Sequence, residues 1–305
     1  MNGIVPLYKP RGMTSFDCVA KIRGILHQKK VGHSGTLDPN VDGVLPICVG
    51  KATKVVPYLM ASGKVYEGAV TLGFSTTTED VDGEIVDQLA LRQAFSNVEI
   101  DRAMQSFVGE ITQIPPMYSA IKINGKKLYE YARQGIEVER PARKITIKSF
   151  ERCGETTFNS QNNTQTINFK VACSKGTYVR TLAVDLGKKL EVPAVMSRLT
   201  RTESGNFQIE DTITFAQLEE AVENKIVENL LVPLDHALKK YPHFALNDDL
   251  WTRVQNGAVL KRSNFNQSQS AEPVLVLTYD DRVQALYQYD QERAAYRPLT
   301  MFLTK

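Results

Sequence analysis

The sequence predicts an α+β fold with a smaller β-rich domain at its C-terminal end. Apolar residues alternate along several short segments, as in strands, and recur every three or four residues in others, as in helices. The tail of roughly 60 residues contains several strand-like segments and is near the lower size limit for independent folding. With 305 residues, the chain is long enough for one large domain and one small domain.

The N-terminal segment predicts a strand followed by a helix. The strand covers 3–8 and the helix covers about 15–28. Thr14 and Asp17 stand three residues apart just before this helix, as in a capping box. Helical spacing predicts the buried face of the helix, which consists of Phe16, Val19, Ile22 and Leu26.

Further strands and helices follow along the chain. A short apolar run predicts a strand over 44–49, and alternating apolar residues predict strands over 65–73 and 167–173. Amphipathic spacing predicts helices over 88–108 and 177–190, and a segment rich in Glu and Ala predicts another over 214–230. The acidic stretch 78–87 between them is typical of a surface loop or hairpin. In the helix over 177–190, Arg180 lies off the apolar stripe.

Two segments divide the chain into parts. Residues 113–143 are rich in Pro, Tyr, Lys and Arg, and so long a polar connection in a compact domain is usually functional or disordered. A Tyr-Pro-His sequence at 241–243 indicates a boundary, and strand-like segments separated by two aspartates follow it. We therefore expect a domain over 1–240, with an insertion at about 113–143, and a second domain over 243–305.

Composition excludes several classes of protein. A chain with 42% hydrophobic and 23% charged residues is neither disordered nor fibrous. No apolar run approaches ~18 residues, so we expect no membrane span. The N-terminus has no basic segment before an apolar core, so we expect no secretory signal and a cytoplasmic protein. The four cysteines lack paired spacing, so we expect them to be reduced and mostly buried.

Charge is distributed unevenly, although the net charge is only +3. Residues 1–54 and 122–148 each carry eight Lys and Arg against three Asp and Glu, whereas residues 76–100 carry six acids and one Arg. Two basic segments can form a face that binds a polyanion such as nucleic acid. Solvated charge on unrelated faces is the other interpretation, and charge alone leaves both open.

Motifs for familiar cofactors are absent from the sequence. It contains no dinucleotide-binding glycine pattern, no phosphate-binding loop motif and no zinc-protease motif, and its four histidines are scattered. We therefore expect no metal and no cofactor. The densest polar cluster is the loop over 32–39, which holds Asp38 before a proline. Asp38 is either a nucleophile or base, or a carboxylate that caps a turn, and the pattern alone leaves both open.

Five short blocks occur in the same order as in a known family. They read KPRGMTS at 9–15, GHSGTLDP at 32–39 with GVLP and GKATK after it, QIPPMYSAIK at 113–122, SKGTYVR at 174–180, and LTRT with GNF at 199–207. Together they resemble the motifs of the TruB family of tRNA pseudouridine synthases. Chance agreement is a poor explanation for an ordered set that spans 9–207.

The resemblance implies a fold and an activity. It implies a mixed, largely antiparallel central sheet with flanking helices, the pseudouridine synthase fold, followed by a PUA-like C-terminal domain. The family isomerises uridine to pseudouridine without a cofactor, and its bacterial members act on position 55 in the T arm of tRNA. We expect a monomer that binds tRNA and no membrane.

The resemblance also assigns roles to single residues. Asp38 matches the catalytic aspartate, Arg180 matches the arginine that pairs with it, and Tyr66 matches the tyrosine that stacks on the flipped base. Further pocket and RNA-binding positions are Tyr178, Leu199 and His33. The residues expected to contact phosphates are Lys9, Arg11, Lys51, Lys122, Lys126, Lys127, Arg140 and Arg143.

Two features near these residues carry expectations of their own. Asp42 is an acid that many family members lack, and we expect it to point outward or cap a turn, because a buried like charge would disfavour an ionised Asp38. The segment 113–143 resembles a mobile insertion that closes over the T loop, and we expect it to be poorly ordered without RNA.

Three other functions fit parts of the pattern. An RNA-binding or tRNA-folding protein on the same scaffold would keep its activity without Asp38, and this role can also coexist with catalysis. A member of the family branch that works in guide-RNA particles would need protein partners. A glycosidase would use the same carboxylate but would release free uracil.

Overall fold

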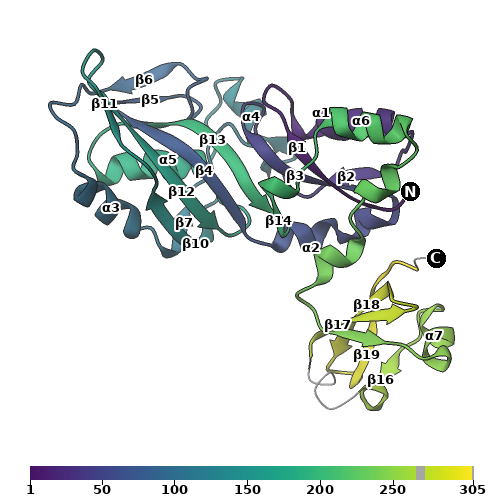
Figure 1. The fold of residues 1–305 in the computed structure, drawn as a ribbon. Coiled ribbons are helices and arrows are strands. Elements are labelled where there is room, and N and C mark those ends of the chain that lie inside the picture. Colours follow the sequence, from purple (N-terminus) through teal and green to yellow (C-terminus); the bar gives the residue numbers. More distant parts are fainter. Residues whose placement is uncertain (266–271, 304–305) are drawn as a thin grey trace. The chain divides into compact units, whose positions relative to one another are not determined.

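The computed structural model describes residues 1–265 and 272–303, which form two compact units by their internal contacts (Figure 1). The first unit combines Met1–Asn40, Val44–Met60 and the chain from Gly205 onward, and the second combines Val41–Gly43 with Ala61–Ser204. The predicted boundary near 240 stays a prediction. Residues 266–271 and 304–305 of the predicted 243–305 domain lie outside the described residues.

The N-terminal part of the first unit is a small sheet with helices packed on it. The sheet pairs β1 with β3, and β2 with β3. The elements are β1 (Gly3–Lys9), α1 (Ser15–Ile25), β2 (Val31–His33), β3 (Asp42–Val49), α2 (Val56–Ala61), β14 (Phe207–Gln208) and α6 (Phe215–Glu223). Apolar residues of β1, α1, β3 and α6 form one buried cluster, so these helices cover the sheet.

The start of α1 confirms one prediction and corrects another. Thr14 caps the helix, and Asp17 completes the capping box by accepting a hydrogen bond from the backbone of Thr14. Phe16, however, is 66% exposed, so its predicted burial is wrong. The buried stripe includes Cys18, and Phe16 points away because it is one residue off that stripe.

The C-terminal end of the first unit is a curled β half-barrel, which confirms the predicted β-rich domain. Its strand order is β15-β17-β18-β19-β16, and its strands are antiparallel except for the parallel pair β15 and β17. The elements are β15 (His243–Ala245), α7 (Asp248–Val254), β16 (Leu260–Lys261), β17 (Val274–Tyr279), β18 (Arg282–Asp290) and β19 (Ala295–Met301). Its inner residues form their own apolar cluster.

The second unit is built on a larger sheet. Its strand order is β13-β4-β12-β10-β7, all antiparallel, with β11 on the side of β12. Asp42 and Gly43 of β3 pair in parallel with β13, so the sheet is mixed, as expected. The elements are β4 (Lys64–Leu72), β5 (Phe74–Thr76), β6 (Ile85–Gln88), α3 (Asn97–Gln105), β7 (Gly109–Gln113), β10 (Arg143–Arg152), β11 (Thr157–Asn159), β12 (Thr164–Cys173), α5 (Val179–Lys189) and β13 (Ala194–Ser204).

Helices α3 and α5 cover this sheet. α3 packs on β10, α5 packs on β13, and the two helices contact each other, so they share one face. The predicted helix over 88–108 is shorter than expected, because the Ser96–Glu99 capping box starts α3 only at Asn97. The acidic stretch forms the β5–β6 hairpin.

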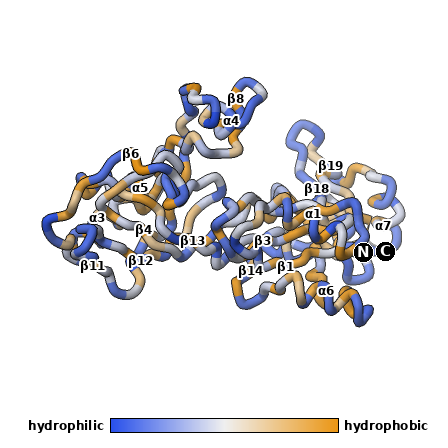
Figure 2. Tube along the Cα trace, turned by 90° about the horizontal axis from the view of Figure 1, so that it is seen from above, coloured by the Kyte–Doolittle hydropathy of each residue, from blue (hydrophilic) through white to orange (hydrophobic). Residues whose placement is uncertain are grey.

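The insertion 113–143 contains regular structure. It holds the two-residue strands β8 (Lys122–Ile123) and β9 (Lys126–Lys127) and the short helix α4 (Leu128–Ala132). Figure 2 shows β8 and α4 extending away from the strands of the same unit. Whether this segment is poorly ordered without RNA stays a prediction.

Two further expectations concern cysteines and membranes. Cys18, Cys48 and Cys173 are buried free thiols, but Cys153 is exposed, so burial was predicted correctly for three of the four. In residues 1–265 and 272–303, no helix has the length and apolar character of a membrane span.

Candidate active site

The loop after Asp38 is fixed by a buried lysine. Lys9 is 0% exposed, and its ammonium donates to the carbonyl oxygens of Pro10 at 2.9 Å, Met13 at 2.6 Å and Pro39 at 3.0 Å. The Pro39 carbonyl also accepts the Gly12 amide at 2.9 Å. Three carbonyl dipoles compensate the buried positive charge, and in return the charge ties Pro39 to the end of β1.

The loop before Asp38 is fixed by a buried serine. The Ser15 hydroxyl accepts the Leu37 amide at 2.8 Å and lies 3.3 Å from the Leu37 carbonyl, to which it donates. The backbone is therefore held immediately before and immediately after Asp38, whose side chain is half-buried. This arrangement suits a carboxylate that must keep a fixed position at a surface.

The burial of Lys9 contradicts its expected contact with a phosphate. An ammonium that is closed to solvent and bonded to three carbonyls is not available to an RNA backbone. The signal in the sequence was a lysine in a basic segment, and such residues are usually exposed. The structure gives Lys9 a structural task instead.

His33 and Lys51 are also in the first unit. The His33 Nδ1 accepts the Gly35 amide at 3.2 Å, and Gly35 has a φ of 147°. The Lys51 ammonium donates to the Leu303 carbonyl, and the Tyr58 hydroxyl lies 3.0 Å from the Thr300 hydroxyl. These contacts join the segment after β3 to the last strand of the half-barrel and to the residues that follow it.

Arg180 lies near the start of α5 and is nearly closed to solvent at 4% exposure. Its two terminal nitrogens donate to the carbonyls of Thr78 at 2.7 Å and Tyr118 at 2.9 Å. Its Nε lies 3.8 Å from the Asp80 carboxylate. Burying a guanidinium is favourable only with such partners, so the acidic turn and the insertion together fix the position of Arg180.

The acidic turn between β5 and β6 also holds the neighbouring residue of α5. Glu79 has a φ of 65°, in the left-handed region, and its carboxylate accepts the Thr181 hydroxyl at 2.6 Å. Burial raises the pKa of Glu79, against the opposing effects of the Thr181 hydrogen bond and the Arg180 charge. The sequence predicted only a surface loop or hairpin here, and its excess of acids was the one signal that could have pointed to Asp80 and Glu79.

Tyr66 and Leu199 lie on adjacent strands of the second unit. Tyr66 on β4 is opposite Arg201 on β13, and Leu199 is opposite Gly68. A Cβ at Gly68 would lie 2.4 Å from the Arg198 carbonyl, so only glycine allows this close pairing. Both Tyr66 and Leu199 are buried, and their predicted place in a pocket stays a prediction.

Two cations missed by the sequence analysis lie beside Tyr66. Arg201 is fully buried. Lys64 is two residues before Tyr66, and burial, followed by the charge of Arg201, lowers the pKa of Lys64 to about 8. The register of β4 and β13 could not be inferred from composition, so this clustering was not predictable.

Asp42 does not point outward as expected. It is the half-buried first residue of β3, and it accepts the hydroxyl of Thr200 on the neighbouring strand β13 at 2.6 Å. Next to it, Gly43 has a φ of 109°, and a Cβ there would lie 2.2 Å from the Arg201 carbonyl. Glycine at 43 thus lets β3 approach β13.

The insertion presents cations beside aromatic rings. Lys122 is exposed on β8, and the Arg140 guanidinium donates to the Pro115 carbonyl at 3.0 Å. Lys127 lies 5.3 Å from the ring centroid of Tyr129, and Lys126 lies 5.9 Å from that of Tyr131. Alternating cations and aromatic faces suit phosphates and unstacked bases.

The predicted site residues are thus divided between the two units. Lys9, His33, Asp38 and Lys51 belong to the first unit, and the structure groups Lys9 and His33 with the Asp38 loop. The second unit contains Tyr66, Lys122, Arg140, Tyr178, Arg180 and Leu199. Within the second unit, Tyr178 and Arg180 start the same helix, and Tyr66 and Leu199 share a strand pair.

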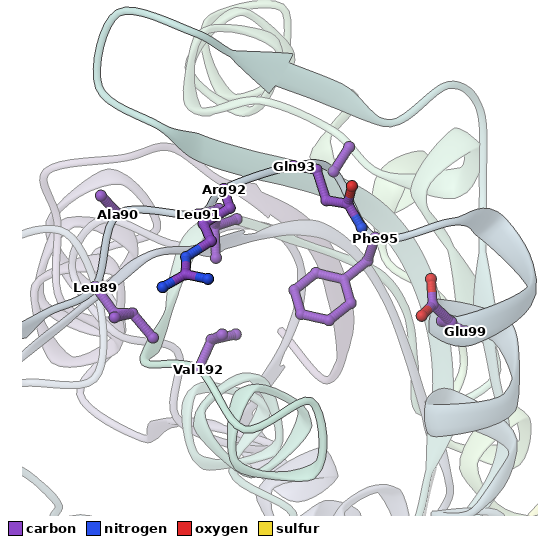
Figure 3. Close-up of a pocket in the computed structure, with 9 residues that line it drawn as sticks. Leu89, Ala90, Leu91, Arg92, Gln93, Phe95, Glu99 and Val192 are labelled. Carbon is purple, nitrogen blue, oxygen red and sulfur yellow. The ribbon is translucent and has the colours of Figure 1, made fainter.

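A cavity in the second unit lies apart from these residues. Its volume is about 300 Å³, and its described lining is Leu89 to Phe95 with Glu99 and Val192. Figure 3 shows the Arg92 and Phe95 side chains on either side of it. None of the predicted site residues is in this lining. Within the described residues, no group of three or more His, Cys, Asp or Glu could hold a metal ion.

Comparisons with known proteins agree over nearly the whole chain. The family described as TruB family pseudouridylate synthase (N terminal domain) matches residues 23–179, and tRNA pseudouridylate synthase B C-terminal domain matches residues 180–239. The chain is 58% identical to the tRNA pseudouridine synthase B of Levilactobacillus brevis, covering 99% of both chains. It is 52% identical to that of Bacillus pumilus, covering 94% of this chain and 93% of the relative.

A solved structure shows the same fold. The crystal structure of a Cbf5-Nop10-Gar1 complex matches with a TM-score of 0.71 at 27% identity, covering 98% of this chain and 84% of that chain. The fold and the family matches define an isomerase of the pseudouridine synthase class, which converts uridine to pseudouridine in tRNA. Within that class, the chain belongs to the TruB family of tRNA pseudouridine synthases.

Proposed function

We propose that this enzyme isomerises the uridine at position 55, in the T loop of tRNA, with Asp38 as its catalytic carboxylate. The observation that carries the proposal is the loop around Asp38, whose backbone is held on one side by Ser15 and on the other by Lys9. A fixed carboxylate can add to the ribose or the base, or can promote elimination at the sugar. Both routes cleave the N-glycosidic bond and need the ionised carboxylate.

The other predicted residues act on the same uridine in this proposal. Tyr66 stacks on the base after it has been flipped out of the T loop, which costs a few kcal/mol of unstacking. Arg180 supplies positive charge that favours an ionised carboxylate, and Tyr178, Leu199 and His33 complete the contacts to the nucleotide. Burial of Tyr66, Leu199 and Arg180 supports these roles, because a desolvated site strengthens each polar interaction.

The insertion and neighbouring cations bind the T arm. Lys122, Lys126, Lys127 and Arg140 lie in that segment, and their contacts with phosphates would make tRNA binding weaken as salt rises. The enzyme acts as a monomer in the cytoplasm, without a guide RNA. The matched chain, in contrast, was crystallised with protein partners in a Cbf5-Nop10-Gar1 complex.

The product made from a naked, unmodified tRNA transcript tests this proposal. The lone purified chain should form one pseudouridine per tRNA at position 55, and a transcript with cytidine at that position should acquire none. Pseudouridine elsewhere would overturn the assigned position, and dependence on added proteins would favour the guide-RNA branch. Release of free uracil would indicate a glycosidase.

A further inference from the structure

The two ends of the basic insertion meet across a pair of strands. Gln113 is the last residue of β7, Arg143 is the first residue of β10, and the two residues are partners in the antiparallel register. Both side chains contact the same distant residue, Tyr178. Tyr178 precedes α5, the helix that carries Arg180.

Gln113 holds the backbone of Tyr178. Its amide nitrogen donates to the Tyr178 carbonyl at 3.0 Å, and its amide oxygen accepts the Tyr178 amide at 2.8 Å. Gln113 is 1% exposed, so these bonds are shielded from water and expensive to break. The Tyr178 carbonyl also accepts the first amide bond of α5, from Leu182 at 3.1 Å. Gln113 therefore fixes the origin of the helix.

Arg143 holds the ring of Tyr178. Its guanidinium carbon lies 4.6 Å from the ring centroid, which is within the range of a cation–π contact. Gly176 packs against the same guanidinium, since a Cβ there would lie in ordinary van der Waals contact with it at 3.6 Å, and the φ of 87° at Gly176 favours glycine. A third contact comes from within the insertion, where the Tyr118 carbonyl accepts from Arg180 at 2.9 Å.

We propose that Gln113 and Arg143 are positioning residues that hold Tyr178 and, through the first turn of α5, set the position of Arg180. Because they are the two ends of the insertion, they join the segment that binds the tRNA to the helix that serves the reaction. Arg143 then contributes to the rate rather than to phosphate binding. The inference rests on the proposed function, since it takes Tyr178 and Arg180 to be site residues.

The chain contains a matched control for Gln113. Gln165 is also 1% exposed, and it grips Phe95 in the same way, accepting its amide at 2.8 Å and donating to its carbonyl at 3.0 Å. Phe95 lines the separate cavity of Figure 3. Replacing either glutamine by leucine removes two hydrogen bonds of the same kind, in each case to the backbone of one residue of the second unit. The two variants should therefore lose similar stability.

The test compares Gln113→Leu with Gln165→Leu in single-turnover pseudouridine formation at saturating enzyme. Gln113→Leu should lower the rate about 100-fold, the size of effect produced by a misplacement of about 1 Å, with little change in the Kd for tRNA. Gln165→Leu should keep a rate close to that of wild type at a comparable loss of melting temperature. Equal rates in the two variants, or a defect in tRNA affinity alone, would overturn the proposal.

Two further variants keep the proposal testable if Gln113→Leu does not fold. In Gln113→Glu, one carboxylate oxygen can still accept the Tyr178 amide, but the other oxygen replaces the donor to the Tyr178 carbonyl. This variant should therefore also slow the single-turnover rate. Arg143→Met should slow it about tenfold and Arg143→Lys should restore most of the loss. If Arg143 only binds phosphate, Arg143→Met will weaken tRNA binding and leave the saturated rate unchanged. A wild-type enzyme that makes no pseudouridine would instead refute the proposed function itself.

Discussion

The loop that carries Asp38 is held by side chains that bind its backbone, whereas Arg180 is held by backbone carbonyls that bind its side chain. In the first region, Lys9 donates a hydrogen bond to the Pro39 carbonyl, and Ser15 accepts one from the Leu37 amide. In the second region, the carbonyls of Thr78 and Tyr118 receive the guanidinium. The first arrangement fixes a chain segment at the surface, and the second fixes one buried charge.

This difference teaches how each charge is kept in place. A carboxylate in a loop is only as well positioned as its backbone, so the supporting side chains are fully buried. An arginine on a helix already has an ordered backbone, so its long side chain needs acceptors along its length. Substitutions should therefore lower the reaction rate in the region of Arg180, and first the stability of the fold in the region of Lys9.

After Asp38 itself, the largest effect on the rate is expected from Arg180. Arg180→Met should lower the single-turnover rate by about 10²–10³-fold, the range seen when one preorganised group at a reacting centre is lost. Arg180→Lys should recover little of it, because an ammonium cannot reach two carbonyls and a carboxylate in the same fixed geometry. The measurement is tritium release from tRNA labelled at uracil C5. Near-normal release by Arg180→Met would show that Arg180 is not a site residue.

A smaller effect, on stability first, is expected from Lys9. Lys9→Met removes the buried donor that the carbonyls of Pro10, Met13 and Pro39 share, which should lower the free energy of unfolding by about 2–4 kcal/mol. Lys188→Met is the control, because Lys188 is exposed and pairs with Asp185 at 3.1 Å, and it should cost less than about 0.5 kcal/mol. Urea denaturation measures both. Similar losses in the two variants would show that the Asp38 loop does not depend on Lys9.

The smallest expected effect is a change in the pH dependence of stability, and it concerns Lys64, a third cation after Arg180 and Lys9. Burial lowers the pKa of Lys64 from 10.5 to about 8, so between those values the unfolded chain binds the proton that the folded chain has lost. The free energy of unfolding should therefore rise with pH across this window in wild type relative to Lys64→Met. Urea denaturation at several pH values measures the difference between the two proteins.

Lys170 provides a control of opposite sign for this pH dependence. Its hydrogen bond to Glu67 raises the pKa of Lys170, so its stabilising contribution is present at neutral pH and is lost as pH rises through the folded pKa. Relative to Lys170→Met, the stability of wild type should fall with pH. If the Lys64 difference also fell with pH, the Lys64 ammonium would be stabilised rather than desolvated.

Local patterns in the sequence predicted the elements that depend on neighbouring residues. The capping box of Thr14 and Asp17, the strand β12 and the helix α5 all follow from spacing within one segment. Asp38 could be placed in a loop because proline and glycine surround it. Its catalytic role came from the order of the five blocks, not from physical patterning.

Contacts between distant segments could not be predicted in this way. Lys9 is buried because Pro39, 30 residues further along the chain, supplies one of its acceptors. Asp80 faces Arg180 only because the β5–β6 hairpin returns to α5. The sequence places Gln113 at the start of a polar segment. Its hydrogen bonds, however, join it to Tyr178, which is 65 residues away in the chain. Such pairs depend on the topology of the sheet, which the spacing of single segments does not contain.

Single-turnover tritium release by Asp38→Asn and Asp42→Asn, measured side by side, tests the central claim most directly. Isomerisation removes the hydrogen from uracil C5, so release reports the new carbon–carbon bond. Asp38→Asn should abolish release and still bind tRNA, because it loses the carboxylate and little else. Asp42→Asn keeps an acceptor for the Thr200 hydroxyl and should retain most of the rate. Continued release by Asp38→Asn, or its loss only in Asp42→Asn, would contradict the assignment of Asp38.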